Sequence, residues 1–163
     1  MIDYRARSTL AQAARVLVAG RITNYQFENR EPESSDPAVK EISYMGFWPL
    51  YSDTPEYRLD GDRKLSPEDR LFAARCILFL KSGLRYSWPI PSWWDSTWLQ
   101  IRSTVTFGRA KREYQEHLSS LGDVDLWPFQ SASQYAEALR SPVYLMGLGS
   151  NNSFKLNPLR GSA

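Results

Sequence analysis

The sequence is poor in the residues on which covalent scaffolds and many catalytic sites depend. Its 163 residues include one cysteine, Cys76, and one histidine, His117. A single cysteine excludes an intramolecular disulfide and makes a reducing, cytoplasmic setting the default expectation. Metal centres usually need two or more histidine or cysteine ligands. We therefore expect no metal ion, no cofactor and no catalytic residue built on this pair.

Long apolar runs are also missing. No stretch approaches the roughly 18 apolar residues of a membrane span, and residues 1–5 lack the apolar segment of a secretory signal. The hydrophobic fraction is 42% and the charged fraction is 23%, which is typical of a soluble, folded chain. These values predict a cytoplasmic protein that does not bind a membrane.

The motifs that could carry chemistry are weak. Gly147 and Gly149 lack the lysine of a Walker loop and the third glycine of a dinucleotide-binding fingerprint. Glu113 and His117 are four residues apart in a predicted helix, a spacing typical of a surface polar pair. Cys76 lies in an apolar stretch, which predicts a small buried core residue rather than a nucleophile.

Apolar spacing and capping signals predict a mainly α fold. Apolar positions on one face indicate a first helix that Gly20 ends, and Thr23 and Asp36 have the sequence context of N-caps. Pro49 is expected to bend or end the helix that follows Asp36. The predicted helices cover residues 4–19, 24–30, 37–48, 67–81, 108–120 and 132–140.

Segment 67–81 is expected to be the central helix. Ser66 and Pro67 supply a cap and a first-turn proline, and the residues near its end are apolar almost all round. We therefore predict one compact helical domain over residues 1–163, with about five to seven helices around this segment. Residues 142–163 are expected to form an irregular tail.

Two segments remain open between alternatives. Asp60-Gly61 suits a hairpin turn within 57–65, but a plain loop is equally consistent with this sequence. Residues 99–107 alternate apolar and polar side chains, so a strand competes with a helix there.

Four tryptophans, Trp88, Trp93, Trp94 and Trp98, form the most unusual cluster in the sequence. Exposed aromatic side chains beside basic groups can stack on sugars or on single-stranded nucleic acid. The more common interpretation is packing in a core or an interface, with Trp88-Pro89 and Trp93-Trp94 covering the central helix.

The net charge of +2 hides an uneven distribution. Residues 28–69 carry eleven acidic and five basic side chains, whereas residues 1–27 and 70–163 are both net basic. Solvated helix faces explain such a pattern in most proteins. The functional interpretation is an acidic surface that steers a basic partner.

We therefore expect a small, non-catalytic protein that binds another protein through an acidic and aromatic surface. An immunity-type protein that neutralises a toxin is one concrete form of this hypothesis. The candidate binding residues are Glu31, Glu33, Asp36, Asp60, Asp62, Trp93 and Trp94.

Two other functional classes remain as alternatives. One is a histidine-independent hydrolase or transferase that acts on a sugar or a nucleotide through convergent carboxylates. The other is a nucleic-acid-binding module that uses the Trp- and Arg-rich residues 85–112. The sequence disfavours nucleic acid, because a pI near 8.7 with strong internal acidity lacks the usual basic footprint.

Overall fold

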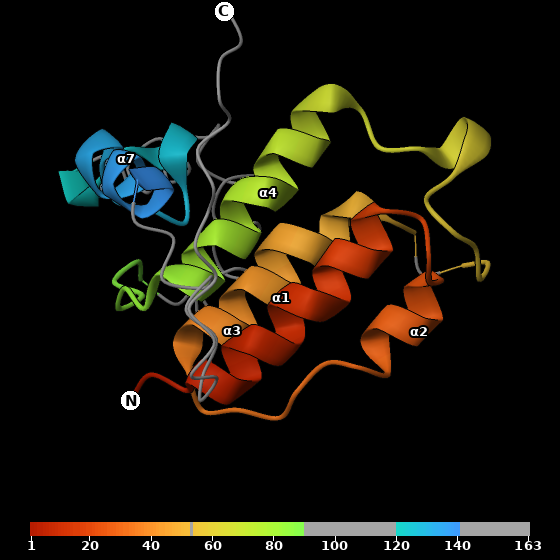
Figure 1. Ribbon diagram of the computed structural model, residues 1–163, viewed down its shortest axis with the longest axis horizontal. Helices are drawn as coiled ribbons and strands as arrows, with labels where there is room; N and C mark the ends of the chain where they lie inside the picture. The colour runs from red at the N-terminus through yellow and green to blue at the C-terminus, as the bar shows by residue number, and fades with distance from the viewer. Residues whose placement is uncertain (53, 90–119, 141–163) are drawn as a thin grey trace, which may run out of the picture.

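The computed structural model describes residues 1–52, 54–89 and 120–140, and these residues are mainly helical (Figure 1). No β-strand occurs within these three ranges, and the predicted fold class is confirmed. The α-helices are α1 (Tyr4–Val18), α2 (Asn24–Glu28), α3 (Pro37–Glu41), α4 (Pro67–Ser82) and α7 (Ala132–Arg140). Shorter helical turns are η1 (Ile42–Phe47), η2 (Trp48–Leu50), η3 (Gly61–Arg63) and η4 (Val124–Leu126).

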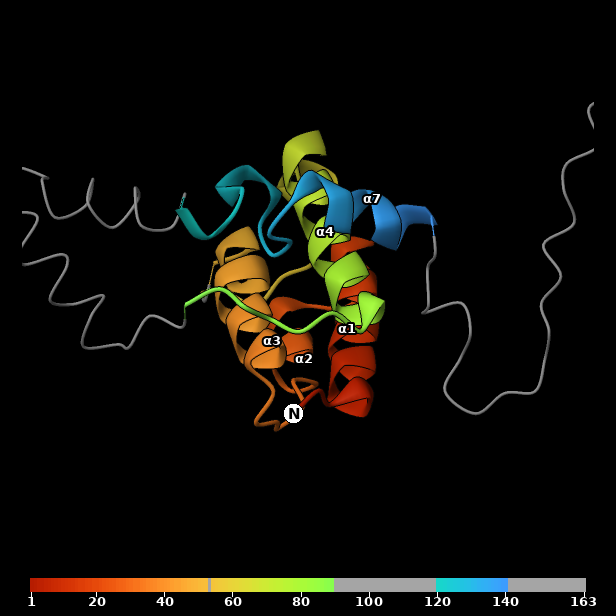
Figure 2. The ribbon, with the colours of Figure 1, turned by 90° about the vertical axis from the view of Figure 1, so that its left-hand side faces the viewer.

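Helices α1 and α4 pack side by side at the centre of the structure (Figures 1 and 2). Leu10 and Leu17 of α1 and Phe79 and Leu80 of α4 are buried between the elements. Helix α4 also contacts η1 and α7, so the segment predicted as the central helix occupies that position. Its apolar character is uneven, because Leu71 near its beginning is 72% exposed.

The predicted capping signals are present in the structure. The Thr23 hydroxyl accepts from the Gln26 N–H, and the Gln26 side chain accepts from the Thr23 N–H, which completes a capping box. Asp36 caps α3 and Ser66 caps α4. Helix α4 ends at Gly83, whose φ of 71° lies in the left-handed region that favours glycine.

The helix predicted over 37–48 changes its hydrogen bonding after Glu41. Residues Ile42–Phe47 form a π-helix, and Trp48–Leu50 form a 3-10 turn. The absence of a side chain at Gly46 permits a close approach to α4, because a Cβ there would lie 3.1 Å from the Cys76 sulfur.

The alternative of a hairpin within 57–65 is wrong. Residues Gly61–Arg63 form a 3-10 turn, and Arg58 forms an isolated bridge with Thr23 instead of pairing within its own segment. The cause is Asn24, whose Oδ1 accepts from the Tyr57 N–H at 2.9 Å. This contact holds the segment against the beginning of α2, so the plain loop is confirmed.

The segment 120–130 contacts α4 through the Trp127 carbonyl, which accepts from Arg75 Nε, and Trp88 is buried in the core. Trp88 is 5% exposed, and its Nε1 donates to the Pro128 carbonyl at 2.9 Å. The last predicted helix is present as α7, with Ser131 accepting from the Gln134 N–H. Predictions for Trp93, Trp94, Trp98, His117, Gly147, Gly149 and the tail lie outside the described residues.

No helix in the described part of the chain is long and apolar enough to cross a membrane.

Candidate functional site

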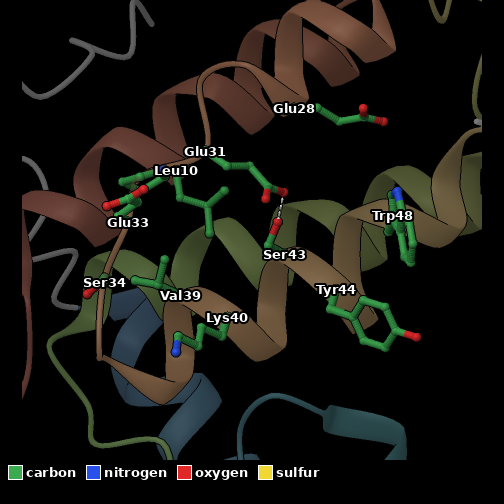
Figure 3. Close-up of a pocket in the computed structure, with 11 residues that line it drawn as sticks. Leu10, Glu28, Glu31, Glu33, Ser34, Val39, Lys40, Ser43, Tyr44 and Trp48 are labelled. Atoms are coloured by element: carbon green, nitrogen blue, oxygen red, sulfur yellow. Dashed lines mark hydrogen bonds between the residues drawn. The ribbon is translucent and has the colours of Figure 1, made fainter. Parts of the chain in front are cut away.

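A pocket of about 680 Å³ lies between α1, the loop 29–36, α3 and η1 (Figure 3). All but one of the residues that line it lie between Glu28 and Trp48, and Leu10 of α1 supplies the contact from a distant part of the sequence. They are Leu10, Glu28, Glu31, Pro32, Glu33, Ser34, Val39, Lys40, Ser43, Tyr44 and Trp48.

Three carboxylates give the pocket its charge. Glu28 ends α2, and Glu31 and Glu33 lie in the loop that follows it. None of the three forms an ion pair with another residue in the described ranges. The Glu31 carboxylate accepts a hydrogen bond from the Ser43 hydroxyl of η1, which fixes this side chain across the pocket (Figure 3).

Two exposed aromatic rings form the opposite side of the pocket. Tyr44 and Trp48 are 59% and 40% exposed, and their ring centroids lie 5.0 Å apart. Met45 beside them is 47% exposed. A second depression, of about 460 Å³, is also lined by Tyr44 and Trp48, together with Met45 and Pro49. Glu28, Glu31, Glu33, Tyr44 and Trp48 together are called the acidic aromatic face below.

The loop that carries Glu31 and Glu33 is anchored by a buried ion pair. Arg7 Nε donates to Asp36 Oδ2 at 2.6 Å, and Arg7 Nη2 donates to Oδ1 at 3.0 Å. The Ser34 hydroxyl donates to Asp3 Oδ2 at 3.0 Å and accepts from the Asp36 N–H. These bonds fix the end of the loop against the beginning of α1, while Ser43 fixes Glu31 near the other end.

The assignment of Asp36 to a docking surface needs correction. Asp36 is 1% exposed, and both of its carboxylate oxygens already accept hydrogen bonds. Burial alone would raise the pKa of Asp36, but hydrogen bonds from Arg7 and from the N–H groups of Asp3 and Ala38 outweigh burial and lower it. Asp36 therefore positions the loop and is not part of the exposed surface.

The other candidate residues do not lie together in the structure. Glu31 and Glu33 line the pocket, whereas Asp60 and Asp62 are exposed at the beginning of η3 and do not line it. The segment containing η3 and the loop 29–36 lie at different edges of the molecule (Figure 1). Trp93 and Trp94 lie outside the described residues.

Glu28, Tyr44 and Trp48 were not predicted from the sequence as site residues. The signal was present for the aromatic pair, because positions i and i+4 share one face of a helix. Their exposure could not be inferred, since aromatic residues at this spacing more commonly face a core.

Other reactive groups have structural explanations. Lys81 Nζ donates to Ser8 Oγ at 2.6 Å, and burial together with the nearby charge of Arg15 lowers the pKa of Lys81. Ser8 lies within α1, where helical hydrogen bonds occupy the N–H groups that an oxyanion would need.

Cys76 is fully buried, and burial raises its pKa to about 12. Within the described ranges, no cluster of three His, Cys, Asp or Glu side chains could hold a metal ion.

Comparisons of the chain with models of protein families, with curated proteins and with solved structures found no match.

Proposed function

We propose that this protein binds a basic region of another protein on the acidic aromatic face. The observation that carries the proposal is that three carboxylates and two exposed aromatic rings line one pocket. Charged groups of one sign steer a partner of opposite charge, and desolvated aromatic side chains supply much of the binding energy at protein interfaces. The immunity-type role is a special case in which the basic partner is a toxin.

The properties of the face favour a protein over the alternative ligands. Nucleic acid is disfavoured because phosphates would meet Glu28, Glu31 and Glu33 at the pocket. A protein partner is favoured because Tyr44, Met45 and Trp48 are large hydrophobic side chains that are exposed near the carboxylates. Tyrosine, tryptophan and methionine are enriched in protein interfaces.

The anchoring of the loop supports a binding role. A flexible acidic loop would lose conformational entropy when a partner orders it, and this cost would weaken the complex. Here Ser43 fixes Glu31, and Asp3 and Arg7 fix Ser34 and Asp36 before any partner arrives. The face therefore already has a defined shape in the protein alone.

The test is affinity capture from native lysate with a variant of the face. In Glu28→Lys/Glu33→Lys, two exposed carboxylates change sign while the structural hydrogen bond of Glu31 remains. The matched control is Asp125→Lys/Glu137→Lys, which gives the same change in net charge at exposed positions outside the pocket. Bound proteins are identified and quantified by mass spectrometry at low and high salt.

We expect the wild-type protein and the control to capture the same basic protein at low salt. The face variant should capture at most about a tenth as much, in line with the loss of a complementary charge pattern. Equal capture by the two variants would contradict the proposal, as would a partner whose bound region is acidic.

A further inference from the structure

We propose that the pocket receives an arginine side chain of the partner, with its guanidinium between the carboxylates and the aromatic rings. This inference rests on the proposed function and identifies the group that enters the pocket. The inference rests on the groups that surround the pocket. Helix α2 and the loop after it supply carboxylates, and η1 and η2 supply the two aromatic rings.

The geometry offers a guanidinium both hydrogen-bond acceptors and a stacking surface. Glu28 and Glu31 lie on one side of the pocket, while Tyr44 and Trp48 lie on the other (Figure 3). The two rings are tilted by 41° with centroids 5.0 Å apart, and both are exposed to an incoming group. A cation over such rings is attracted by their negative faces.

Arginine fits this arrangement better than lysine. The guanidinium is planar, carries five N–H donors, stacks on aromatic rings and is weakly hydrated. It can therefore donate to Glu31 and Glu28 at its edge while its face contacts Tyr44 or Trp48. An ammonium group is compact and strongly hydrated, and it has no plane to stack. The pocket should therefore prefer arginine to lysine at equal charge.

The remaining residues of the pocket are consistent with this occupant. Leu10 and Val39 are buried apolar residues that line it and can contact the methylene groups of the side chain. Lys40 is the one cation among the lining residues, and its side chain points away from Glu31 (Figure 3). The carboxylate of Glu31 is therefore not neutralised by Lys40.

The test is an NMR titration of the full chain, labelled with ¹⁵N, with three small probes. The probes are the N-acetyl methylamides of arginine, lysine and citrulline. Citrulline has nearly the shape of arginine but no charge. Glu31→Gln is the key variant, because the amide oxygen can still accept from the Ser43 hydroxyl while the negative charge is removed. Asp125→Asn removes one exposed carboxylate outside the pocket and serves as the control.

We expect arginine to shift the amide signals of Glu31, Ser43, Tyr44 and Trp48. Lysine should bind at least about threefold more weakly, and citrulline should cause no saturable shift. Glu31→Gln should weaken arginine binding at least about fivefold, whereas Asp125→Asn should leave it unchanged. Equal binding of arginine and lysine, or shifts at other surfaces only, would overturn the inference.

The two proposals fail separately. Loss of arginine selectivity with retained, face-dependent capture of a basic protein would overturn only the arginine inference. Selective binding of the arginine probe without capture of any basic protein would contradict the proposed protein partner and would leave the pocket as a guanidinium site.

Discussion

Arg7 and Asp36 form an ion pair at 2.6 Å with side chains that are only 1% and 2% exposed. The pair joins α1 to the cap of α3, and Arg7 Nη1 also donates to the Leu84 carbonyl after α4 at 2.6 Å. One guanidinium thus connects three segments that are distant in sequence. Because the loop 29–36 ends at Asp36, the same contact also sets the position of the acidic aromatic face.

Arg7→Met should strongly destabilise the fold. The substitution leaves the Asp36 carboxylate buried without its cation, a change that typically lowers the free energy of unfolding by about 3–5 kcal/mol. Urea denaturation followed by circular dichroism measures the effect. Arg5→Met is the control, because Arg5 is exposed and its loss should change stability by less than about 0.5 kcal/mol. A similar, small effect of both substitutions would contradict the structural role of the pair.

Because of the same ion pair, we expect the free energy of unfolding to decrease in acid. The pKa of Asp36 in the folded state lies below its ordinary value of 3.8, so the unfolded chain binds more protons as the pH falls through this range. The stabilisation is therefore present above about pH 4 and decreases as the pH falls towards the folded-state pKa. Urea midpoints measured at a series of pH values should decrease on acidification.

Asp36→Asn provides the control for this pH dependence. The variant should be less stable at neutral pH, and its midpoints should decrease less steeply with acidification than those of the wild-type protein. Asp3 still contributes in the variant, because hydrogen bonds from the Ala6 N–H and from Ser34 lower its pKa. Parallel pH profiles for the two proteins would show that Asp36 does not cause the acid sensitivity.

Features that depend on a few neighbouring residues could be predicted from the sequence, whereas features that depend on residues distant in the chain could not. The caps at Thr23, Asp36 and Ser66 were predicted because a cap is a local pattern of a few residues. The burial of Asp36 was not predicted, because its partner Arg7 lies 29 residues away and no local pattern reports it. The expectation of an acidic surface treated these carboxylates as equivalent, whereas folding buried one and exposed others.

The pocket illustrates the same limit. Glu31 and Glu33 were selected from the acidic block, but the site also needs Tyr44 and Trp48, which sequence analysis assigned to an ordinary helix. Their helical spacing is visible in the sequence, but their exposure depends on how this segment packs, and Gly46 brings it close to Cys76 of α4. That contact joins elements that are separated in the chain, so helical periodicity alone could not reveal it.

Cys76 should be unreactive in the folded protein. Its side chain is fully buried, and burial raises its pKa to about 12; the reactive thiolate is therefore scarce near neutral pH. An aromatic disulfide reagent should label the thiol only after urea unfolds the chain. Rapid labelling under native conditions would contradict the packing of η1 against α4.

Arg75 should hold the segment 120–130 on α4. Its Nε donates to the Trp127 carbonyl at 2.8 Å, and its guanidinium lies 5.5 Å from the centroid of the Phe72 ring. Arg75→Ala removes this hydrogen bond and should lower the free energy of unfolding by about 1–2 kcal/mol. Hydrogen exchange should accelerate at Trp127 and Phe129. Arg70→Ala at an exposed position of α4 should leave exchange there unchanged.

The role of the acidic aromatic face is tested most directly by the association rate of the captured partner with three purified proteins at several salt concentrations. We expect the wild-type protein and Asp125→Lys/Glu137→Lys to associate at similar rates, which decrease as salt screens the charges. Glu28→Lys/Glu33→Lys should associate at least about tenfold more slowly at low salt, with a weaker or reversed salt dependence. Equal rates and equal salt dependence for all three proteins would contradict an acidic aromatic face that recruits a basic partner.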